Sequence, residues 1–415
     1  MYGMNDFCKT PSLLNKAFGN NVELLPGVNE LFELELAFME YNCLPSNQLL
    51  ERTAFIKSLN NHFSKHYLLY SNYSEKINTE RTSATQAYFE EGKFSTGYAT
   101  HGLFPYRGKF HPQLIKGLMN ILNIQKGETV LDPMAGSGTT NIESALMGIN
   151  SIAIDVSPFC QFMIKTKYEA LTIELKSLEN TKFDSRKIFE LFTNGNVLER
   201  INKIEDNNKR KIYDLAFLAF LDALGYSKRV IKSNHQQLFD KVLPRYIETV
   251  KSFLSNPYFE QDKIGSLKIV SDSDALNMKI EKDSIDYVIT SPPYSFAIDY
   301  AENDRDQLEF LGYDADELKN KLIGLKGKTK SQKLQNYFSD MDTFCAQVSR
   351  LLKQGKYFVM IIGSNTNQTG GVRLEETVIN SALKYDMPLI KSILKPIKGM
   401  RNTMKDEYVL IFEKQ

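Results

Sequence analysis

The amino-acid sequence predicts an α/β fold in which helices cover both faces of a largely parallel sheet. Residues 128–131 and 285–289 are short apolar runs typical of buried strands. A glycine turn and a helical run follow the first of them, and a further apolar run at 151–154 completes a βαβ unit. Because open α/β sheets bind ligands at the carboxyl ends of their strands, the turns after these runs are candidate sites.

The turn after the first run has the sequence DPMAGSGTT, residues 132–140. Gly136 and Gly138 let the backbone pass close to a ligand, and Asp155 follows about 20 residues later, where Rossmann-like folds place a ribose-binding carboxylate. The third glycine of a dinucleotide fingerprint and the Gly-Lys-Ser/Thr of a phosphate loop are both missing from this turn. Asp132 would repel a pyrophosphate and attract an ammonium group. A cofactor with a ribose and an ammonium group but no phosphates fits, which predicts S-adenosyl-L-methionine.

The turn after the second run is Ser291-Pro292-Pro293-Tyr294. The prolines fix the backbone, so the carbonyls of Ser291 and Pro292 can point outward as acceptors while Tyr294 offers a flat stacking face. Acceptors beside an aromatic face suit a planar base that bears an exocyclic amino group. Taken alone, the same residues also suit a proline-stiffened turn with a core tyrosine.

Together the two motifs resemble those of the amino-methyltransferases that act on DNA, which combine D-P-F-x-G-S-G-T-T with [D/N/S]-P-P-[Y/F/W]. The serine form is more similar to the enzymes that methylate N4 of cytosine than to those that methylate N6 of adenine. The resemblance covers roughly residues 101–160 and 265–415. It implies a Rossmann-like methyltransferase sheet with a closing β-hairpin, and site-specific transfer to a base flipped out of double-stranded DNA.

The resemblance also implies a biological role and the roles of single residues. The implied biological role is that of the modification enzyme of a restriction system, whose cognate restriction endonuclease acts separately. The expected catalytic residues are Ser291, Pro292, Pro293 and Tyr294. The expected cofactor-binding residues are Phe104, Asp132, Pro133, Ala135, Gly136, Gly138, Thr139, Asp155, Asp274 and Ala275.

The expected organisation is a helical N-terminal region over 1–100, a methyltransferase core over 101–159 and 263–415, and a helical insert over 160–262. A helix is predicted over 47–59 in the first of these regions. Because the core ends with its hairpin close to the end of the chain, target recognition is expected from the insert or from the N-terminal region.

Bulk charge neither requires nor excludes nucleic acid, since 51 basic and 50 acidic side chains give a net charge of +1. A DNA-binding face must therefore come from local clusters. Lysines crowd the stretch 319–333, and basic residues flank the apolar helix of the insert, although such runs are often only solvated. The expected DNA-binding residues are Lys326, Lys328, Lys330, Lys209, Arg210, Gln236 and Gln237.

The four cysteines and five histidines show no metal-ligand spacing, which predicts no metal and a reducing compartment. No basic-then-apolar leader and no apolar run of membrane length is evident, so a cytoplasmic protein is expected. Cys160 lies in a sequence similar to the nucleophile motif of cytosine-C5 enzymes, but it follows the second strand and is expected to be a buried helix residue. Three alternatives stay open: an adenine-N6 DNA enzyme, an RNA guanine-N2 methyltransferase, and a non-catalytic nucleic-acid-binding module.

Overall fold

The computed structural model describes residues 11–28, 30–76, 97–106, 108–229, 234–293, 299–363, 369, 371–396 and 406–415. The chain forms two compact units. The helical unit comprises Met1–Gln125 and Thr166–Ile264, and the sheet unit comprises Lys126–Lys165 and Gly265–Gln415. No helix in the described ranges combines the length and the apolar character that crossing a membrane requires.

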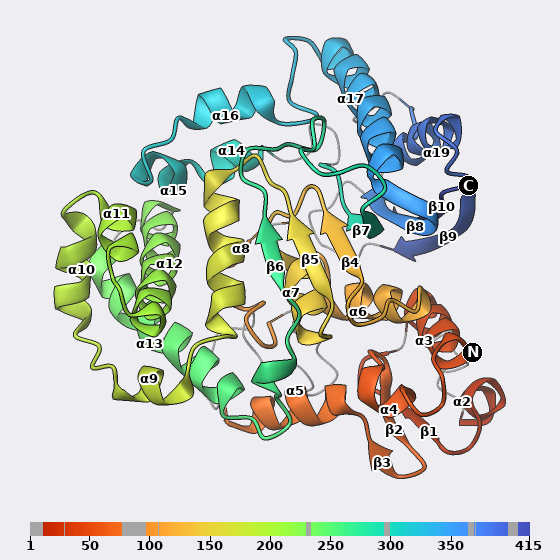
Figure 1. Cartoon of the computed structure of the whole chain (residues 1–415), viewed down its shortest axis with the longest axis horizontal. Coiled ribbons are helices and arrows are strands. Elements are labelled where there is room, and N and C mark those ends of the chain that lie inside the picture. Colours follow the sequence, from red (N-terminus) through yellow and green to blue (C-terminus); the bar gives the residue numbers. More distant parts are fainter. Residues whose placement is uncertain are drawn as a thin grey trace, which may run out of the picture. The chain divides into compact units, whose positions relative to one another are not determined.

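The sheet unit contains a seven-stranded sheet in the order β6-β5-β4-β7-β8-β10-β9 (Figure 1). Its strands are β4 (Thr129–Asp132), β5 (Asn150–Ala153), β6 (Leu267–Ile269), β7 (Ile285–Thr290), β8 (Leu352–Gly363), β9 (Leu389–Pro396) and β10 (Asp406–Glu413). Strands β4 to β8 run parallel to one another, and β10 runs antiparallel to both β8 and β9. The predicted Rossmann-like sheet with its closing hairpin is confirmed, although residues 401–405 of the expected hairpin lie outside the described residues.

The helices of the sheet unit are α7 (Thr139–Leu146), the first part of α8 (Pro158–Ala170), α14 (Tyr300–Asn303), α15 (Arg305–Phe310), α16 (Ala315–Lys321), α17 (Lys330–Leu351) and α19 (Leu374–Lys384). Leu131, Val288, Phe358 and Phe412 are register partners across four strands, so their side chains share one face of the sheet. They belong to the same buried apolar cluster as the inward side of α17 and α19. On β5, Ala153 packs with Ile164 of α8 in a second cluster.

The central strand β7 is buried along its whole length, as expected for a parallel strand with neighbours on both sides. Both carboxylate oxygens of its one charged residue, Asp286, accept a hydrogen bond. Asp286 Oδ2 accepts the N–H of Thr129 at 2.9 Å, and Oδ1 accepts from Lys353 Nζ at 2.7 Å. Burial of a charge inside the sheet is tolerated here because both oxygens are hydrogen-bonded.

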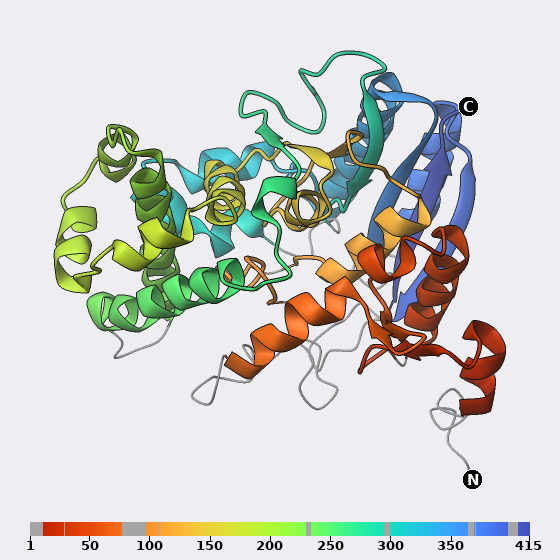
Figure 2. The same ribbon diagram turned by 60° about the horizontal axis from the view of Figure 1, so that its bottom comes forward.

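The helical unit holds α2 (Pro11–Phe18), α3 (Leu31–Cys43), α4 (Leu49–Arg52), α5 (Lys65–Lys76), α6 (Pro112–Ile121), α9 (Leu175–Asn180), α10 (Ser185–Thr193), α11 (Val197–Asn202), α12 (Asn207–Arg229), α13 (His235–Leu254) and a 3-10 turn (Gln261–Lys263). The long helices α12 and α13 of the insert lie side by side (Figure 1, Figure 2). The first hundred residues also form a three-stranded antiparallel sheet of β1 (Val22–Leu24), β2 (Ile56–Leu59) and β3 (His62–Phe63).

The predicted helix over 47–59 is wrong in its second half, because α4 ends at Arg52 and β2 begins at Ile56. The Thr53 hydroxyl accepts the N–H groups of Phe55 and Ile56, and it donates to Glu40 at 2.6 Å. The buried carboxylate of Glu40, from α3, thus stabilises a turn at Thr53 where the local spacing of apolar residues favours a helix. This tertiary hydrogen bond overrides the local helix preference.

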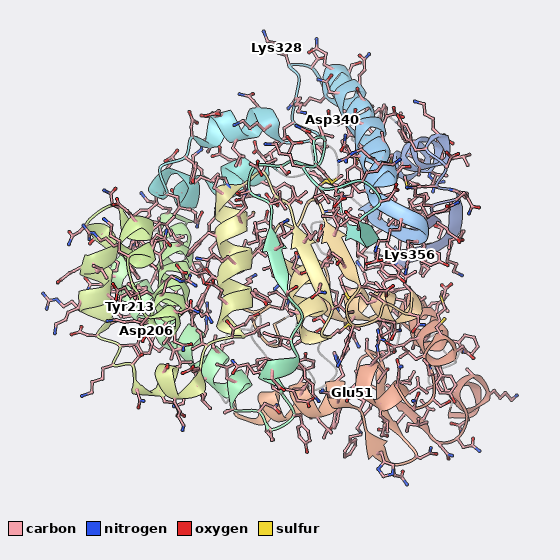
Figure 3. All side chains as sticks on the ribbon, viewed as in Figure 1. Glu51, Asp206, Tyr213, Lys328, Asp340 and Lys356 are labelled. Atoms are coloured by element: carbon pink, nitrogen blue, oxygen red, sulfur yellow. The ribbon has the colours of Figure 1, made fainter. Side chains whose placement is uncertain are left out.

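We expect Glu40→Ala to lower the free energy of unfolding by about 3 kcal/mol, because it leaves buried donors without an acceptor. Glu40 is fully buried and also accepts from the N–H of Ala54 and the amide of Asn120, at 2.7 and 2.6 Å. The matched control is Glu51→Ala, which removes only an exposed ion pair with Lys65 and should cost about 1 kcal/mol or less (Figure 3). Urea denaturation of the full chain measures both, and equal losses would contradict the role of Glu40.

Candidate functional site

The glycine turn joins β4 to α7 at the carboxyl edge of the sheet. Gly136 and Gly138 adopt left-handed backbone conformations, with φ of +52° and +78°. A Cβ atom at Gly138 would also come within 2.9 Å of the Ile164 side chain, so glycine is required there for conformation and for packing. The N–H of Ala135 donates to the Ile154 carbonyl at 3.0 Å, which fastens the turn to the end of β5.

Asp155 follows β5 and holds the same turn from the other side. Its Oδ2 accepts the N–H of Gly136 and its Oδ1 accepts the N–H of Ser157, each at 2.8 Å. Burial raises the pKa of this carboxyl to about 6, while the two N–H donors act to lower it. The expected ribose-binding carboxylate therefore stands beside the glycine turn and at the start of α8.

Asp132 is the last residue of β4 and is 1% exposed. Its Oδ1 accepts from the Thr290 hydroxyl at 2.7 Å and from the N–H of Met134 at 3.2 Å. Burial raises the pKa of Asp132 to about 6. The Thr290 and Thr140 side chains and the Met134 N–H act to lower it, and the charge of Asp155 acts to raise it. Two such carboxylates at one sheet edge favour a positively charged ligand.

The bond between Thr290 and Asp132 joins the two sequence motifs at a topological switch point. The chain passes from β4 to β5 on one side of β4, and β7 lies on its other side. Ligands of open α/β sheets bind where the strand order reverses in this way. Ser291 and Pro292 continue directly from Thr290, and Pro292 is buried. Tyr294 lies outside the described residues.

The other expected cofactor residues divide between the units. Pro133, Ala135 and Thr139 lie in the glycine turn or at the first position of α7. Asp274 and Ala275 lie in the loop after β6, the neighbour of β5. In this loop Asp274 Oδ1 accepts the backbone N–H groups of Leu276 and Asn277. Phe104 belongs to the helical unit, is 6% exposed and donates its N–H to the Tyr246 hydroxyl at 2.7 Å.

Thr290 is a residue of the candidate site that the sequence analysis does not include. Thr290 could have been found as the polar end of a buried strand directly before the proline turn. Cys160 is 1% exposed in α8, which confirms the expectation of a buried helix residue.

The lysine-rich stretch is partly neutralised within the sheet unit. Lys326 pairs with Asp340 at 3.1 Å, and Lys319 and Lys321 pair with Asp299 and Glu317. Lys328 makes no ion pair with any described residue and extends outward from the loop before α17 (Figure 3). Lys330 is also exposed.

The expected DNA-binding residues of the insert also differ in their surroundings. Arg210 makes ion pairs with Glu169 and Asp214, each at 2.9 Å, so its charge is balanced internally. Lys209 is exposed beside a hollow of about 230 Å³ that Tyr213 also lines. Gln236 and Gln237 lie in the first turn of α13, where the Asn234 side chain accepts their backbone N–H groups.

Residues 103–212 match the family model UPF0020, described as an RMKL-like methyltransferase domain. The chain is 26% identical to the Type II methyltransferase M.BsoBI of Geobacillus stearothermophilus over 61% of this chain and 62% of that protein. It is 28% identical to the Type II methyltransferase M.MjaII of Methanocaldococcus jannaschii over 37% of this chain and 30% of that protein. The aligned part thus spans less than two thirds of either relative.

A tRNA (guanine(10)-N2)-dimethyltransferase of Methanothermobacter thermautotrophicus is 34% identical over 53 residues, 13% of this chain and 16% of that protein. The structure of TrmN from Thermus thermophilus aligns with a TM-score of 0.36 at 13% identity, over 74% of this chain and 50% of that one. The predicted resemblance to the S-adenosylmethionine-dependent methyltransferases is confirmed by the family model and the Type II relatives. S-adenosyl-L-methionine is the cofactor of that family.

The residues at the sheet edge fit this cofactor. Its ammonium and sulfonium groups are cations, and neither the buried Asp132 nor the half-buried Asp155 has an ion-pair partner in the described part of the chain. The left-handed Gly136 and Gly138 leave the backbone open to a close approach. No group of three or more His, Cys, Asp or Glu side chains in the described ranges could hold a metal ion.

We expect the affinity for S-adenosylmethionine to fall as the pH is lowered from about 7.5 to about 5.5, approaching tenfold per pH unit below the pKa. An acid whose pKa is about 6 is ionised above that pH, and only the ionised Asp132 attracts the ammonium group. Calorimetry measures the dissociation constant across this range.

The matched variants are Asp132→Asn, which should bind weakly with a flattened pH profile, and Asp286→Asn. Asp286 is a buried carboxylate near the opposite end of β7, paired with Lys353, so its variant should keep the wild-type profile. A flat profile in the wild-type protein would contradict the assignment of Asp132.

Proposed function

We propose that this chain, with the fold and motifs of an S-adenosylmethionine-dependent methyltransferase, transfers a methyl group to the exocyclic N4 of cytosine in double-stranded DNA. The observation that carries the proposal is the 2.7 Å hydrogen bond from Thr290 to Asp132. It brings the cofactor turn and the start of the Ser291-Pro292-Pro293-Tyr294 motif to one switch point of the sheet. Serine at position 291 supports cytosine N4 over adenine N6 as the acceptor.

The acceptor amine is a poor nucleophile, because its lone pair is delocalised into the base, so positioning is the main task of the site. When bound, the cofactor supplies an electrophilic methyl group on a positively charged sulfur. The Ser291 hydroxyl and the Pro292 carbonyl accept the amino hydrogens and turn the nitrogen lone pair toward the methyl group, while Tyr294 stacks on the base. The N–C bond forms as the S–C bond breaks, and the amine releases one proton to water.

The base must leave the duplex to reach this edge, which costs a few kcal/mol that stacking and phosphate contacts offset. Exposed Lys328, Lys330 and Lys209 are the proposed phosphate contacts. Residues 160–262 are the proposed target-recognition region, with Gln236 and Gln237 as base readers. The two Type II relatives support DNA as the substrate and a role as the modification enzyme that accompanies a separate restriction endonuclease.

Mass spectrometry of nucleosides from cells that express the full chain tests the proposal. We expect N4-methylcytosine in DNA. N6-methyladenine in its place would support the adenine alternative, and N2-methylguanosine in tRNA alone would support the RNA alternative. No new methylated nucleoside in either nucleic acid would favour a non-catalytic binding module.

We expect Ser291→Ala to reduce methyl transfer by about 10²-fold or more, because the amine loses an acceptor that orients it. Cofactor affinity should remain close to that of the wild-type protein. The matched control is Cys160→Ser, which should stay active because direct transfer to an amine uses no thiol nucleophile. Radioactive methyl transfer to DNA measures both, and trapping of a covalent complex at Cys160 would overturn the mechanism.

We expect Lys328→Ala to weaken binding to all DNA sequences and to reduce the slope of log affinity against log salt by about one. The Lys328 side chain is exposed, whereas Lys326 is already paired with Asp340. Lys326→Ala is therefore the control, and its salt slope should change less. Fluorescence anisotropy at several salt concentrations measures the slopes, and identical slopes in all three proteins would contradict the contact at Lys328.

A further inference from the structure

Thr290 ends β7, is fully buried and stands directly before Ser291. Its hydroxyl donates to Asp132 Oδ1 at 2.7 Å, the shorter of two hydrogen bonds on that oxygen. Thr290 touches both motifs, because its side chain contacts the carboxylate of Asp132 and its backbone continues into the Ser291-Pro292-Pro293 turn.

The backbone register of β4 and β7 pairs residues that precede these two strand ends. The paired residues of β4 and β7 are Val130 with Tyr287 and Leu131 with Val288, so the ladder stops short of Asp132 and Thr290. On its other side Thr290 is in register with Met360 of β8. The side-chain hydrogen bond from Thr290 to Asp132 adds a direct contact between the end of β7 and the end of β4.

We propose that Thr290 is a positioning residue whose hydroxyl holds the ionised Asp132 carboxylate for the cofactor ammonium and couples that carboxylate to the placement of Ser291 and Pro292. This inference rests on the proposed function. Both bonds fall on Oδ1, so Oδ2 is the oxygen through which Asp132 would accept from a ligand. A hydroxyl donor also favours the charged form of a buried acid, whereas an apolar side chain would not.

The other groups that act on Asp132 come from three neighbouring segments. They are Met134 of the turn, Thr140 of α7 and Asp155 after β5. A substitution at Thr290 leaves all three in place. Its effect on the pH dependence of cofactor binding therefore reports on the Thr290 hydroxyl.

The test compares Thr290→Val, Thr290→Ser and the wild-type full chain. Cofactor affinity is measured by calorimetry across pH, and kcat is measured on DNA at saturating cofactor. With valine we expect the pH midpoint of cofactor binding to rise by about one unit, with roughly tenfold weaker binding below it, and kcat to fall. Serine restores a hydroxyl at the same position and should return both quantities toward the wild-type values.

The matched control is Thr166→Val on α8, where a buried threonine hydroxyl has no hydrogen-bond partner among the described residues. It should leave the pH midpoint and kcat unchanged. Should Thr290→Val not fold, Thr290→Cys, which keeps a similar volume with a weak donor, should give an intermediate rise in the midpoint.

A lower melting temperature in Thr290→Val with an unshifted pH midpoint and unchanged kcat would overturn the inference, because a merely structural hydroxyl predicts that result. This outcome leaves the proposed function intact, since the wild-type protein still binds the cofactor and methylates DNA. If the wild-type protein neither binds the cofactor nor transfers a methyl group, the proposed function fails and the inference fails with it.

Discussion

The hydrogen bond between Thr290 and Asp132 fixes how the ends of two neighbouring strands meet, and the rest of the site is arranged around those ends. Every strand in the parallel part of the sheet ends at one edge, so the residues that follow β4, β5, β6 and β7 gather there without any long-range sequence signal. The glycine turn, Asp155 and the loop that bears Asp274 follow three of these strands. The proline turn follows the fourth.

Carboxylates at the two edges of the sheet have different kinds of partner. At the amino edge Asp286 pairs with Lys353 at 2.7 Å, and Glu128 pairs with Lys356 at 2.5 Å (Figure 3). At the carboxyl edge Asp132 and Asp155 accept only hydroxyl and N–H groups of the described residues, and burial raises the pKa of each. A cationic ligand would supply the compensation that lysines supply at the other edge, which is the physical basis for placing the cofactor here.

Local sequence could predict the parts of the fold and site whose structure depends on residues close together in the chain. The apolar strands, the glycine turn and the buried Cys160 helix are examples. The break at Thr53 could not be predicted, because it depends on a carboxylate of α3, thirteen positions earlier in the sequence. Sequence marks Thr290 as the polar end of a buried strand, but its bond to Asp132 could not be predicted, since that bond requires the strand order that places β7 beside β4. Contacts between distant segments decide such positions, and periodicity carries no information about them.

The charge available on the basic residues could not be predicted from the sequence either, because it depends on ion pairs formed in the fold. A count of lysines over 319–333 suggests a strongly positive face, but Lys319, Lys321 and Lys326 are already paired with carboxylates. In the insert Arg210 is paired as well, which leaves Lys209 beside Tyr213. A lysine that must release a carboxylate before it can contact a phosphate gains less from DNA than a free one does. The number of phosphate contacts should therefore follow the unpaired lysines and be smaller than the local charge of the sequence implies.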